Sequence, residues 1–208
     1  MLAPLPRRRT FLATSGLTLA CGLLGIVWGR AMVPHAAAPL PTYGQVPAFS
    51  LTDHRGQPVT RATLAGSVWI ADFIFTRCAG QCPMMSAQMA SLKRALQGAP
   101  GIRLVSFSVD PSHDTPQRLA DYAVHYGALD RRWLFMTGEP AAMTSLVQDG
   151  FHLGIGLDGS AREPITHSVR LVLVDQQGLI RGYYDATDAA AMAQLQRDAR
   201  RLARSHAY

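Results

Sequence analysis

Two near-continuous apolar runs constrain the fold of this chain most strongly. They read VWIADFIF at residues 68–75 and IRLVSFSV at residues 102–109. Strands covered on both faces have this composition, whereas strands with one face in water alternate polar and apolar residues. After the first run, apolar residues recur at helical spacing: Met85, Met89, Leu92 and Leu96. The two runs therefore predict buried strands of a sheet, the first followed by a helix that ends near Gly98.

The rest of the sequence extends this alternation of strands and helices. SLTDHRGQPVT predicts a hairpin before the first buried strand, and RWLFMTG a later strand. Helices are expected after the cap Thr115 and from Pro140, and HSVRLVLVD and LIRGYYD predict a hairpin around Gln176–Gly178. A terminal helix carrying Met192 and Leu195 follows. The order predicts an α/β domain, a central mixed sheet flanked by helices, and its closing hairpin and helix are typical of a thioredoxin-like fold.

The first 33 residues are expected to be a signal or membrane anchor. Arginines at 7–9 precede an apolar run of 19 residues, 11–29, close to the roughly 20 that span a bilayer as a helix. Positive charge before the run predicts a cytoplasmic N-terminus. The domain is therefore expected to be exported and to face the periplasm from a bacterial inner membrane. RRTFL also resembles a twin-arginine export signal. Cleavage after residues 36–38 and lipid attachment at Cys21 remain alternatives to a retained anchor.

Composition and charge exclude several classes of protein. A Pro/Ala-rich linker is expected over residues 34–47 and one domain over 48–208. The net charge is +6, but beyond the leader 16 basic residues face 14 acidic ones, so the domain itself is close to neutral. We find no nucleic-acid-binding motif, and we expect a monomer. Three cysteines, one of them in the leader, are too few for a disulfide-framework protein.

Two cysteines follow the first apolar run in TRCAGQCP. Cys78 comes where the strand is expected to end, and Cys82 where the helix should begin, with Pro83 at its first position. The carboxyl edge of a parallel sheet is where sites of open α/β folds are built. Free N–H groups and the positive dipole end at a helix N-terminus favour thiolate over thiol. We therefore expect reactive cysteines, because a bridge across so short a loop would stabilise the fold little.

The spacing of the two cysteines leaves two chemistries open. Dithiol redox motifs usually have two intervening residues, and this pair has three, although a disulfide can still close across the turn. The wider loop also lets both sulfurs converge on one ion, and two soft thiolates suit Cu(I) or Zn(II). Structural zinc needs four ligands, and the domain has only these two cysteines. Copper accepts two thiolates with one imidazole, so a suitably placed histidine is expected.

Of the seven histidines, His167 is the candidate ligand. It follows EPIT at the start of the strand SVRLVLVD. In a thioredoxin fold the loop before that strand lies against the active-site turn. The other histidines fall in the linker, the tail, the hairpin, beside a helix cap, on a helix and in a loop, and ordinary roles are expected for them: His35, His206, His54, His113, His125 and His152.

Four segments together resemble the SCO/SenC copper-chaperone family. They read ADFIFTRCAGQCPMM, RLVSFSVDPSHDTPQRLADYA, RWLFMTG and ITHSVRLVLVDQQGLIRGYYD, and the resemblance extends from about Val46 to the last helix. It implies a thioredoxin-like domain on a membrane anchor that helps to build the copper A centre of cytochrome c oxidase. The implied partner is the copper-site subunit of the oxidase or another cuproprotein. The implied copper ligands are Cys78, Cys82 and His167, with the cysteines also forming a redox-active pair.

Between the cysteines the family often has a Pro-Asp-Val-like segment, whereas this chain has AGQ at residues 79–81. This difference leaves the identity of the docking partner open.

Asp72 resembles the buried aspartate of thioredoxins that accepts a proton from the inner thiol, with a structural core aspartate as the alternative. Asp110 should lie at the same sheet edge. Met84 and Met85 are possible soft ligands, but packing is preferred for them.

The alternative function is a thiol–disulfide oxidoreductase that reduces cysteines of a partner protein, which needs no His167. Whether the chain is an enzyme stays open, and a chaperone role is preferred. A peroxidase is disfavoured because Thr76 lies two residues before Cys78 rather than three.

Overall fold

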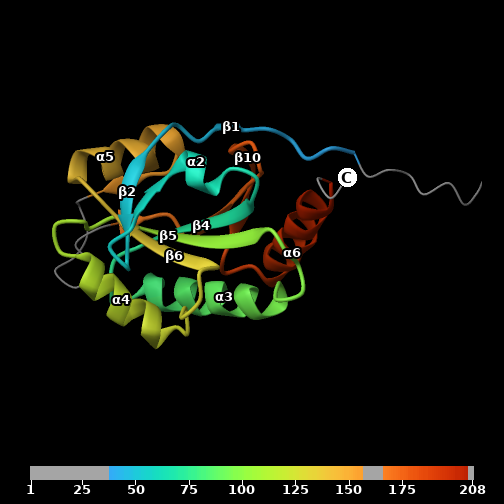
Figure 1. Ribbon diagram of the computed structural model, residues 1–208. Helices are drawn as coiled ribbons and strands as arrows, with labels where there is room; N and C mark the ends of the chain where they lie inside the picture. The colour runs from blue at the N-terminus through green and yellow to red at the C-terminus, as the bar shows by residue number, and fades with distance from the viewer. Residues whose placement is uncertain (1–37, 157–165, 206–208) are drawn as a thin grey trace, which may run out of the picture. The chain divides into compact units, whose positions relative to one another are not determined.

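The computed structural model describes residues 38–156 and 166–205 (Figure 1). For 155–156 and 166–167 it describes the main chain alone. The chain divides into a unit of residues 1–39 and a compact unit from Leu40 to Tyr208. The expected anchor over residues 1–33 lies outside the described residues. Within the described part, no helix has the length and apolar character needed to cross a membrane.

In the described residues, one mixed sheet forms the centre of the second unit. Its spatial order is β1-β10-β9-β4-β5-β6-β2-β3. Strands β4, β5 and β6 run parallel, and every other pairing in this sheet is antiparallel. The bounds are β1 Gly44–Gln45, β2 Ser50–Asp53, β3 Pro58–Thr60, β4 Val68–Ile74, β5 Ile102–Ser108, β6 Trp133–Thr137, β9 Arg170–Val174 and β10 Leu179–Asp185. Both predicted hairpins and the predicted mixed sheet are confirmed.

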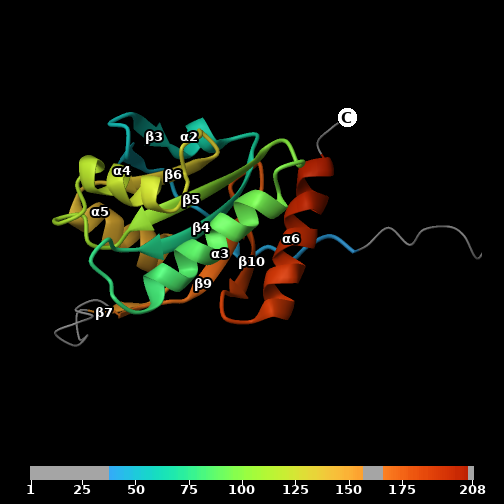
Figure 2. The ribbon, with the colours of Figure 1, turned by 90° about the horizontal axis from the view of Figure 1, so that it is seen from below.

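Helices cover both faces of this sheet (Figures 1 and 2). Helices α3, α4 and α6 contribute to one apolar core, and α2, α5 and the π-helical turn η1 to the other. Their bounds are α2 Arg61–Leu64, α3 Gln81–Ala95, α4 Pro116–His125, α5 Pro140–Ser145, η1 Leu146–Gly150 and α6 Ala189–Arg204. The Thr115 hydroxyl accepts from the N–H of Arg118 and caps α4 as predicted.

Strand β4 lies between the two cores and positions the site at its end. All seven of its residues are buried, as the apolar run predicted. Ile70 and Ile74 pack toward α3, and Trp69 and Phe73 pack on the opposite face. Burying each such side chain contributes about 1.5–3 kcal/mol. The end of β4 is therefore held rigidly at the carboxyl edge of the sheet.

Outside the thiol turn, the structure differs from the sequence predictions in three places. Residues 44–45 form β1 against β10, and Val46 is fully buried, so the second half of the expected linker reaches into the sheet and core. The helix from Pro140 changes to π-helical geometry at Leu146. The strand expected from His167 onward is two separate pieces, because β8 (Thr166–His167) pairs with β7 (Ile155–Gly156) in a second sheet and β9 starts only at Arg170.

Candidate functional site

The two cysteines occupy the turn between β4 and α3. Cys78 is half-buried in the turn, and Cys82 is fully buried in the first turn of the helix; no disulfide joins these two cysteines. The main-chain N–H of Cys82 donates a hydrogen bond to the Cys78 sulfur at 3.4 Å. The residue at the N-cap position is Gly80, which has no side chain that could cap the helix. The amide end of α3 thus faces Cys78, which confirms the strand-to-helix position predicted for the pair.

Pro83 is not at the first helical position, because α3 begins at Gln81 and Pro83 is its third residue. The first four N–H groups of a helix have no partner within it, so a proline at the third position sacrifices no helical hydrogen bond. This shift places Cys82 inside the helix and leaves Cys78 outside it.

The two thiols are not equivalent. Burial raises the pKa of the Cys82 thiol far above its ordinary value, and the neighbouring Cys78 side chain raises it further. The expectation that the helix N-terminus favours thiolate at both cysteines is therefore wrong for Cys82 in the metal-free protein, since desolvation outweighs the dipole. Cys78 is the accessible sulfur of the pair.

Asp72 is a fully buried carboxyl on the α3 side of β4. It is in register with Ser106 on β5, and it shares a strand face with Ile70 and Ile74. Neither carboxyl oxygen has a hydrogen-bond partner. Burial raises the pKa of Asp72 to about 7, against a smaller opposing effect of the Ser106 hydroxyl. The Asp72 charge in turn adds to the raised pKa of Cys82, so the two groups are electrostatically coupled. Asp72 therefore keeps both interpretations, a proton acceptor for the inner thiol and a structural core aspartate beside Ser106.

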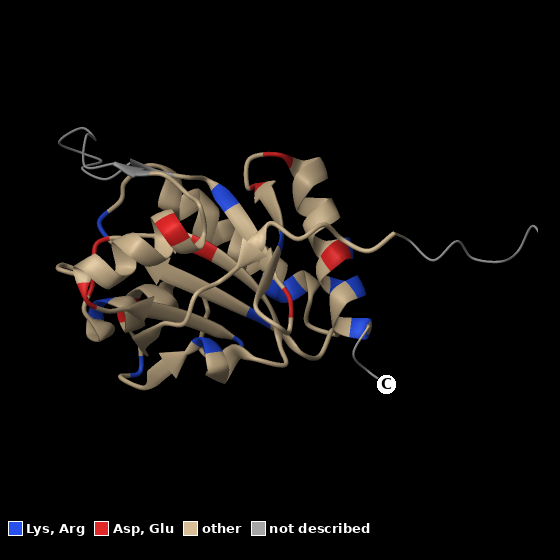
Figure 3. Cartoon of the chain, turned by 90° about the horizontal axis from the view of Figure 1, so that it is seen from above, with Lys and Arg blue, Asp and Glu red and all other residues tan. Residues whose placement is uncertain are grey.

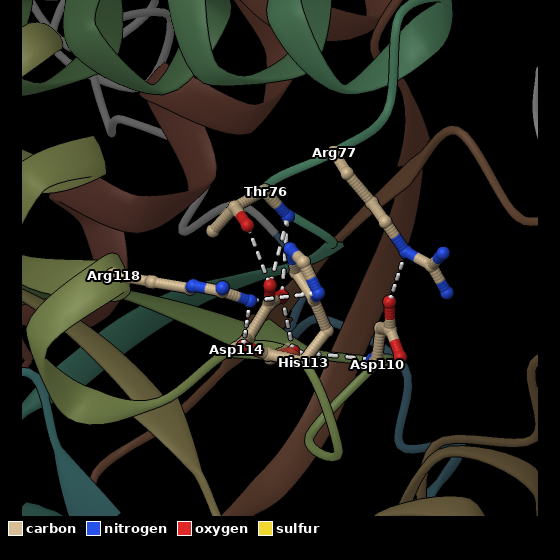
Figure 4. Close-up of polar contacts among 7 residues, drawn as sticks. Thr76, Arg77, Asp110, His113, Asp114 and Arg118 are labelled. Atoms are coloured by element: carbon tan, nitrogen blue, oxygen red, sulfur yellow. Dashed lines mark hydrogen bonds and ion pairs between the residues drawn. The ribbon is translucent and has the colours of Figure 1, made fainter.

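A second carboxylate, Asp114, fastens the loop that carries Cys78 (Figure 4). It is fully buried and accepts hydrogen bonds from the Thr76 main-chain N–H at 3.1 Å and from the Thr76 hydroxyl at 2.6 Å. The Ser108 hydroxyl, at the end of β5, donates to the same carboxylate at 2.6 Å. Asp114 therefore ties the segment after β4 to the segment after β5.

Asp110 makes the neighbouring link. Its carboxylate accepts from Arg77 Nε at 2.6 Å, and its main-chain N–H donates to Ser108 Oγ (Figure 4). The prediction that Asp110 lies at the thiol edge of the sheet is confirmed. Asp114 was missed, although the signal was available: two acidic residues in DPSHDTP, directly after a buried strand, should meet the end of the adjacent parallel strand.

His167 is placed only in part. Its main chain pairs with Ile155 in the β7–β8 sheet, and Figure 2 shows β7 at the end of the unit where α3 begins. Its side chain lies outside what the structure describes. Among the described side chains, no group of three His, Cys, Asp or Glu residues is arranged to hold a metal ion. The third ligand therefore stays a prediction.

The remaining candidates have structural roles where they are described. Met85 is fully buried in the core, and Met84 packs against it, as preferred from the sequence. His54 is buried with its Nδ1 accepting from the Phe135 N–H, and burial lowers its pKa. His113 Nδ1 lies 2.7 Å from Arg118. His35, His206 and Cys21 lie outside the described residues.

Comparison with known proteins gives a consistent picture. The SCO1/SenC family model matches residues 39–203. The SCO1 protein homolog of Bacillus subtilis is 40% identical over 95 residues, which cover 45% of this chain and 49% of that protein. A protein of Stutzerimonas stutzeri whose name describes copper binding is 30% identical over 175 residues, covering 82% of this chain and 84% of the relative. The chain thus matches about half the length of the first relative and most of the second.

Solved structures with the same fold include a SCO1/SenC family lipoprotein from Bacillus anthracis, with a TM-score of 0.71 and 30% identity over 77% of this chain and 95% of that one. BsSco, described as a member of the Sco family of cytochrome c oxidase assembly proteins with a disulfide switch, has a TM-score of 0.70 and 27% identity over 79% and 97%. Bradyrhizobium japonicum ScoI, solved with copper bound, has a TM-score of 0.62 at 23% identity over 74% and 98%, which shows the shared fold.

Proposed function

The chain belongs to the SCO1/SenC family, and we propose that it is a copper-binding assembly factor that holds copper through Cys78, Cys82 and His167. The copper is cargo, delivered to the copper A centre of cytochrome c oxidase or to another cuproprotein. The observation that carries this proposal is the hydrogen bond from the Cys82 N–H to the Cys78 sulfur, which places both thiols at the amide end of one helix.

The donor set fits copper. Thiolates are the soft ligands that Cu(I) prefers, and electron density on the Cys78 sulfur is stabilised by the helix amide. Metal binding has to displace the proton of the buried Cys82 thiol, whose pKa burial raises. A neutral imidazole from His167 would complete three-coordination, which leaves the ion open to exchange onto a partner's ligands. The copper-bound ScoI structure and the S. stutzeri relative support the choice of metal.

We further propose that the domain works outside the bacterial inner membrane as a monomer, held by a helix within residues 1–33. The sequence of that segment supports this: three arginines precede its apolar run, and a twin-arginine-like pattern suits export of a folded domain.

Thiol–disulfide exchange is the second candidate function, and the unequal exposure of the two cysteines favours it. The Cys78 thiolate would attack a partner's disulfide, form a mixed disulfide and release one partner thiolate. Cys82, after losing its proton, would attack the Cys78 sulfur and release the second partner thiol. The Cys78/Cys82 pair is oxidised to a disulfide, and the partner disulfide is reduced to two thiols. Asp72, with a pKa of about 7, is the nearby group that could take the Cys82 proton. The disulfide switch described for BsSco supports this chemistry.

One titration separates the two functions. The reduced protein is titrated with Cu(I) against a competing chelator, using wild type, Cys78→Ser and His167→Ala. Copper binding is supported if wild type binds one equivalent and Cys78→Ser loses most of its affinity. If wild type binds no better than Cys78→Ser, the copper proposal is wrong. If His167→Ala binds copper like wild type and still exchanges thiols, the oxidoreductase becomes the leading function.

A further inference from the structure

The two ends of the domain along the strand direction differ in charge: one is mainly basic, and the other carries residues of both signs (Figure 3). Basic side chains gather at the end opposite the thiol turn, over the last turn of α3, the start of β5, the loop before β6 and the last turns of α6. We name this surface the basic end and define it by Lys93, Arg94, Arg103, Arg131, Arg132 and Arg204. Helix α6 adds further arginines along its second half.

Hydrogen bonds from basic side chains to main-chain carbonyls show that these segments lie together. Arg132 Nη2 donates to the Leu96 carbonyl at the end of α3 at 2.9 Å, and Lys93 Nζ donates to the Gly127 carbonyl at 2.7 Å. Arg200 of α6 donates to the carbonyl of Ala95, also at the end of α3. Two adjoining open hollows, of about 300 and 490 Å³, share Gln97 and Arg132 and are lined by five of the six residues that define the basic end.

Acidic side chains do not balance this surface. Asp130 is the exposed carboxylate beside it, and it is paired with Lys93 at 3.0 Å. Among the described ion pairs, none involves Arg94, Arg103, Arg131 or Arg204. The carboxylates instead follow the strand ends at the thiol edge, at Asp110, Glu139, Asp185 and Asp188. A domain that is nearly neutral overall therefore carries a strongly positive end.

We propose that the basic end docks on the anionic headgroups of a lipid bilayer, so that the thiol turn points away from the membrane. The start of the unit agrees with this orientation. Leu40, its first residue, has its carbonyl bonded by Arg181 near the start of β10, and it packs against the same core as Leu202 and Ala203 in the last turn of α6. Strand β4 separates the two ends by its seven residues, about 20 Å. Headgroup binding at one end leaves the other free for a partner, and this inference does not depend on copper.

The test uses the fragment 38–208, since both apolar cores are built from buried residues between Val46 and Ala199. Its co-sedimentation is measured with vesicles of phosphatidylcholine alone and with about one-third phosphatidylglycerol. We expect binding only to the anionic vesicles at about 0.05 M salt and loss of that binding at about 0.5 M. Equal binding to neutral vesicles, or no binding to anionic ones, overturns the proposal.

Matched double variants locate the surface. Arg94→Gln/Arg131→Gln removes two exposed charges from the basic end, and Arg118→Gln/Arg170→Gln removes two exposed charges elsewhere. At about fivefold per arginine, the first pair should weaken vesicle binding by roughly 25-fold, and the second should leave it within about twofold of wild type. Circular dichroism and thermal melting establish that each variant is folded. An equal loss in both variants would mean that net charge, not this end, drives binding.

Inorganic phosphate identifies the source of the anion. At equal ionic strength it should release the domain from vesicles no better than sodium chloride does. Release by phosphate at much lower concentration would identify a site for a free anion and would contradict docking on a lipid surface.

Discussion

The main-chain N–H of Cys82 lies 3.4 Å from the sulfur of Cys78 and donates a hydrogen bond to it. This contact makes the two cysteines chemically unequal, because one sulfur accepts from the helix end while the other is buried beneath it. The difference gives each cysteine a distinct part in metal binding and in thiol exchange.

Alkylation should therefore distinguish the cysteines. In the reduced, metal-free protein we expect iodoacetamide to modify Cys78 at least about ten times faster than Cys82 at neutral pH, since Cys78 is partly exposed whereas Cys82 is fully buried. Mass spectrometry of peptides from a time course measures both rates. Cys82→Ser should keep the fast reaction and Cys78→Ser should lose it. Equal rates at the two positions would refute the asymmetry.

The buried Asp72 carboxyl should make stability fall as the pH rises. Its folded pKa of about 7 lies above the ordinary 3.8, so the folded state keeps a proton that the unfolded state has lost. This contribution is complete below about pH 4 and is lost as the pH rises through about 7, by up to about 4 kcal/mol. Asp72→Asn should lack this loss. Urea unfolding of both proteins at pH 5 and pH 8 measures the part of this loss that falls between those values, about 3 kcal/mol.

The comparison between the two proteins isolates Asp72. His54 acts in the opposite direction, because burial lowers its pKa, but it is present in both proteins and cancels. If wild type and Asp72→Asn lose the same free energy of unfolding between the two pH values, Asp72 is not the group responsible.

Asp114 should be the residue that fixes the thiol loop. Asp114→Ala leaves the Thr76 N–H, the Thr76 hydroxyl and the Ser108 hydroxyl without their acceptor. We expect the free energy of unfolding to fall by about 3 kcal/mol. Copper affinity should fall as well, because the loop that carries Cys78 loses the hydrogen bonds that link it to the end of β5 through Asp114. Urea unfolding and the chelator competition measure the two effects.

Asp121→Ala is the matched control, since Asp121 is exposed on α4 and, among the described residues, accepts from Gln117 alone. It should change stability by less than about 0.5 kcal/mol. A loss of stability in Asp114→Ala with copper affinity unchanged would show that Asp114 supports the fold without positioning the thiols.

Local sequence signals predicted most of the framework. The apolar run of β4 revealed burial on both faces, and Thr115 with Pro116 located the start of α4. Features that depend on distant partners were missed: β1 exists only because Gly44 pairs with Ile180, and β7–β8 only because Ile155 pairs with His167. Nothing within either short segment encodes its partner.

The candidate site was predictable to a similar degree. Strand ends in a parallel sheet share an edge, which located Cys78 and Asp110 correctly. The high pKa of Cys82 could not be predicted, because the burial that causes it comes from core packing around the helix. The acidic pair in DPSHDTP indicated that Asp114 lies at this edge, but its particular hydrogen bond with Thr76, across 38 residues of sequence, could not be predicted from that pattern.

Copper coordination in the loaded protein tests the central claim most directly. X-ray absorption of the Cu(I) complex, at one metal per chain, should give two sulfur ligands and one nitrogen for wild type. His167→Ala should lose the nitrogen and keep both sulfurs, whereas Cys78→Ser should lose one sulfur. A wild-type site without nitrogen, or one unchanged by His167→Ala, would contradict the proposed set of Cys78, Cys82 and His167.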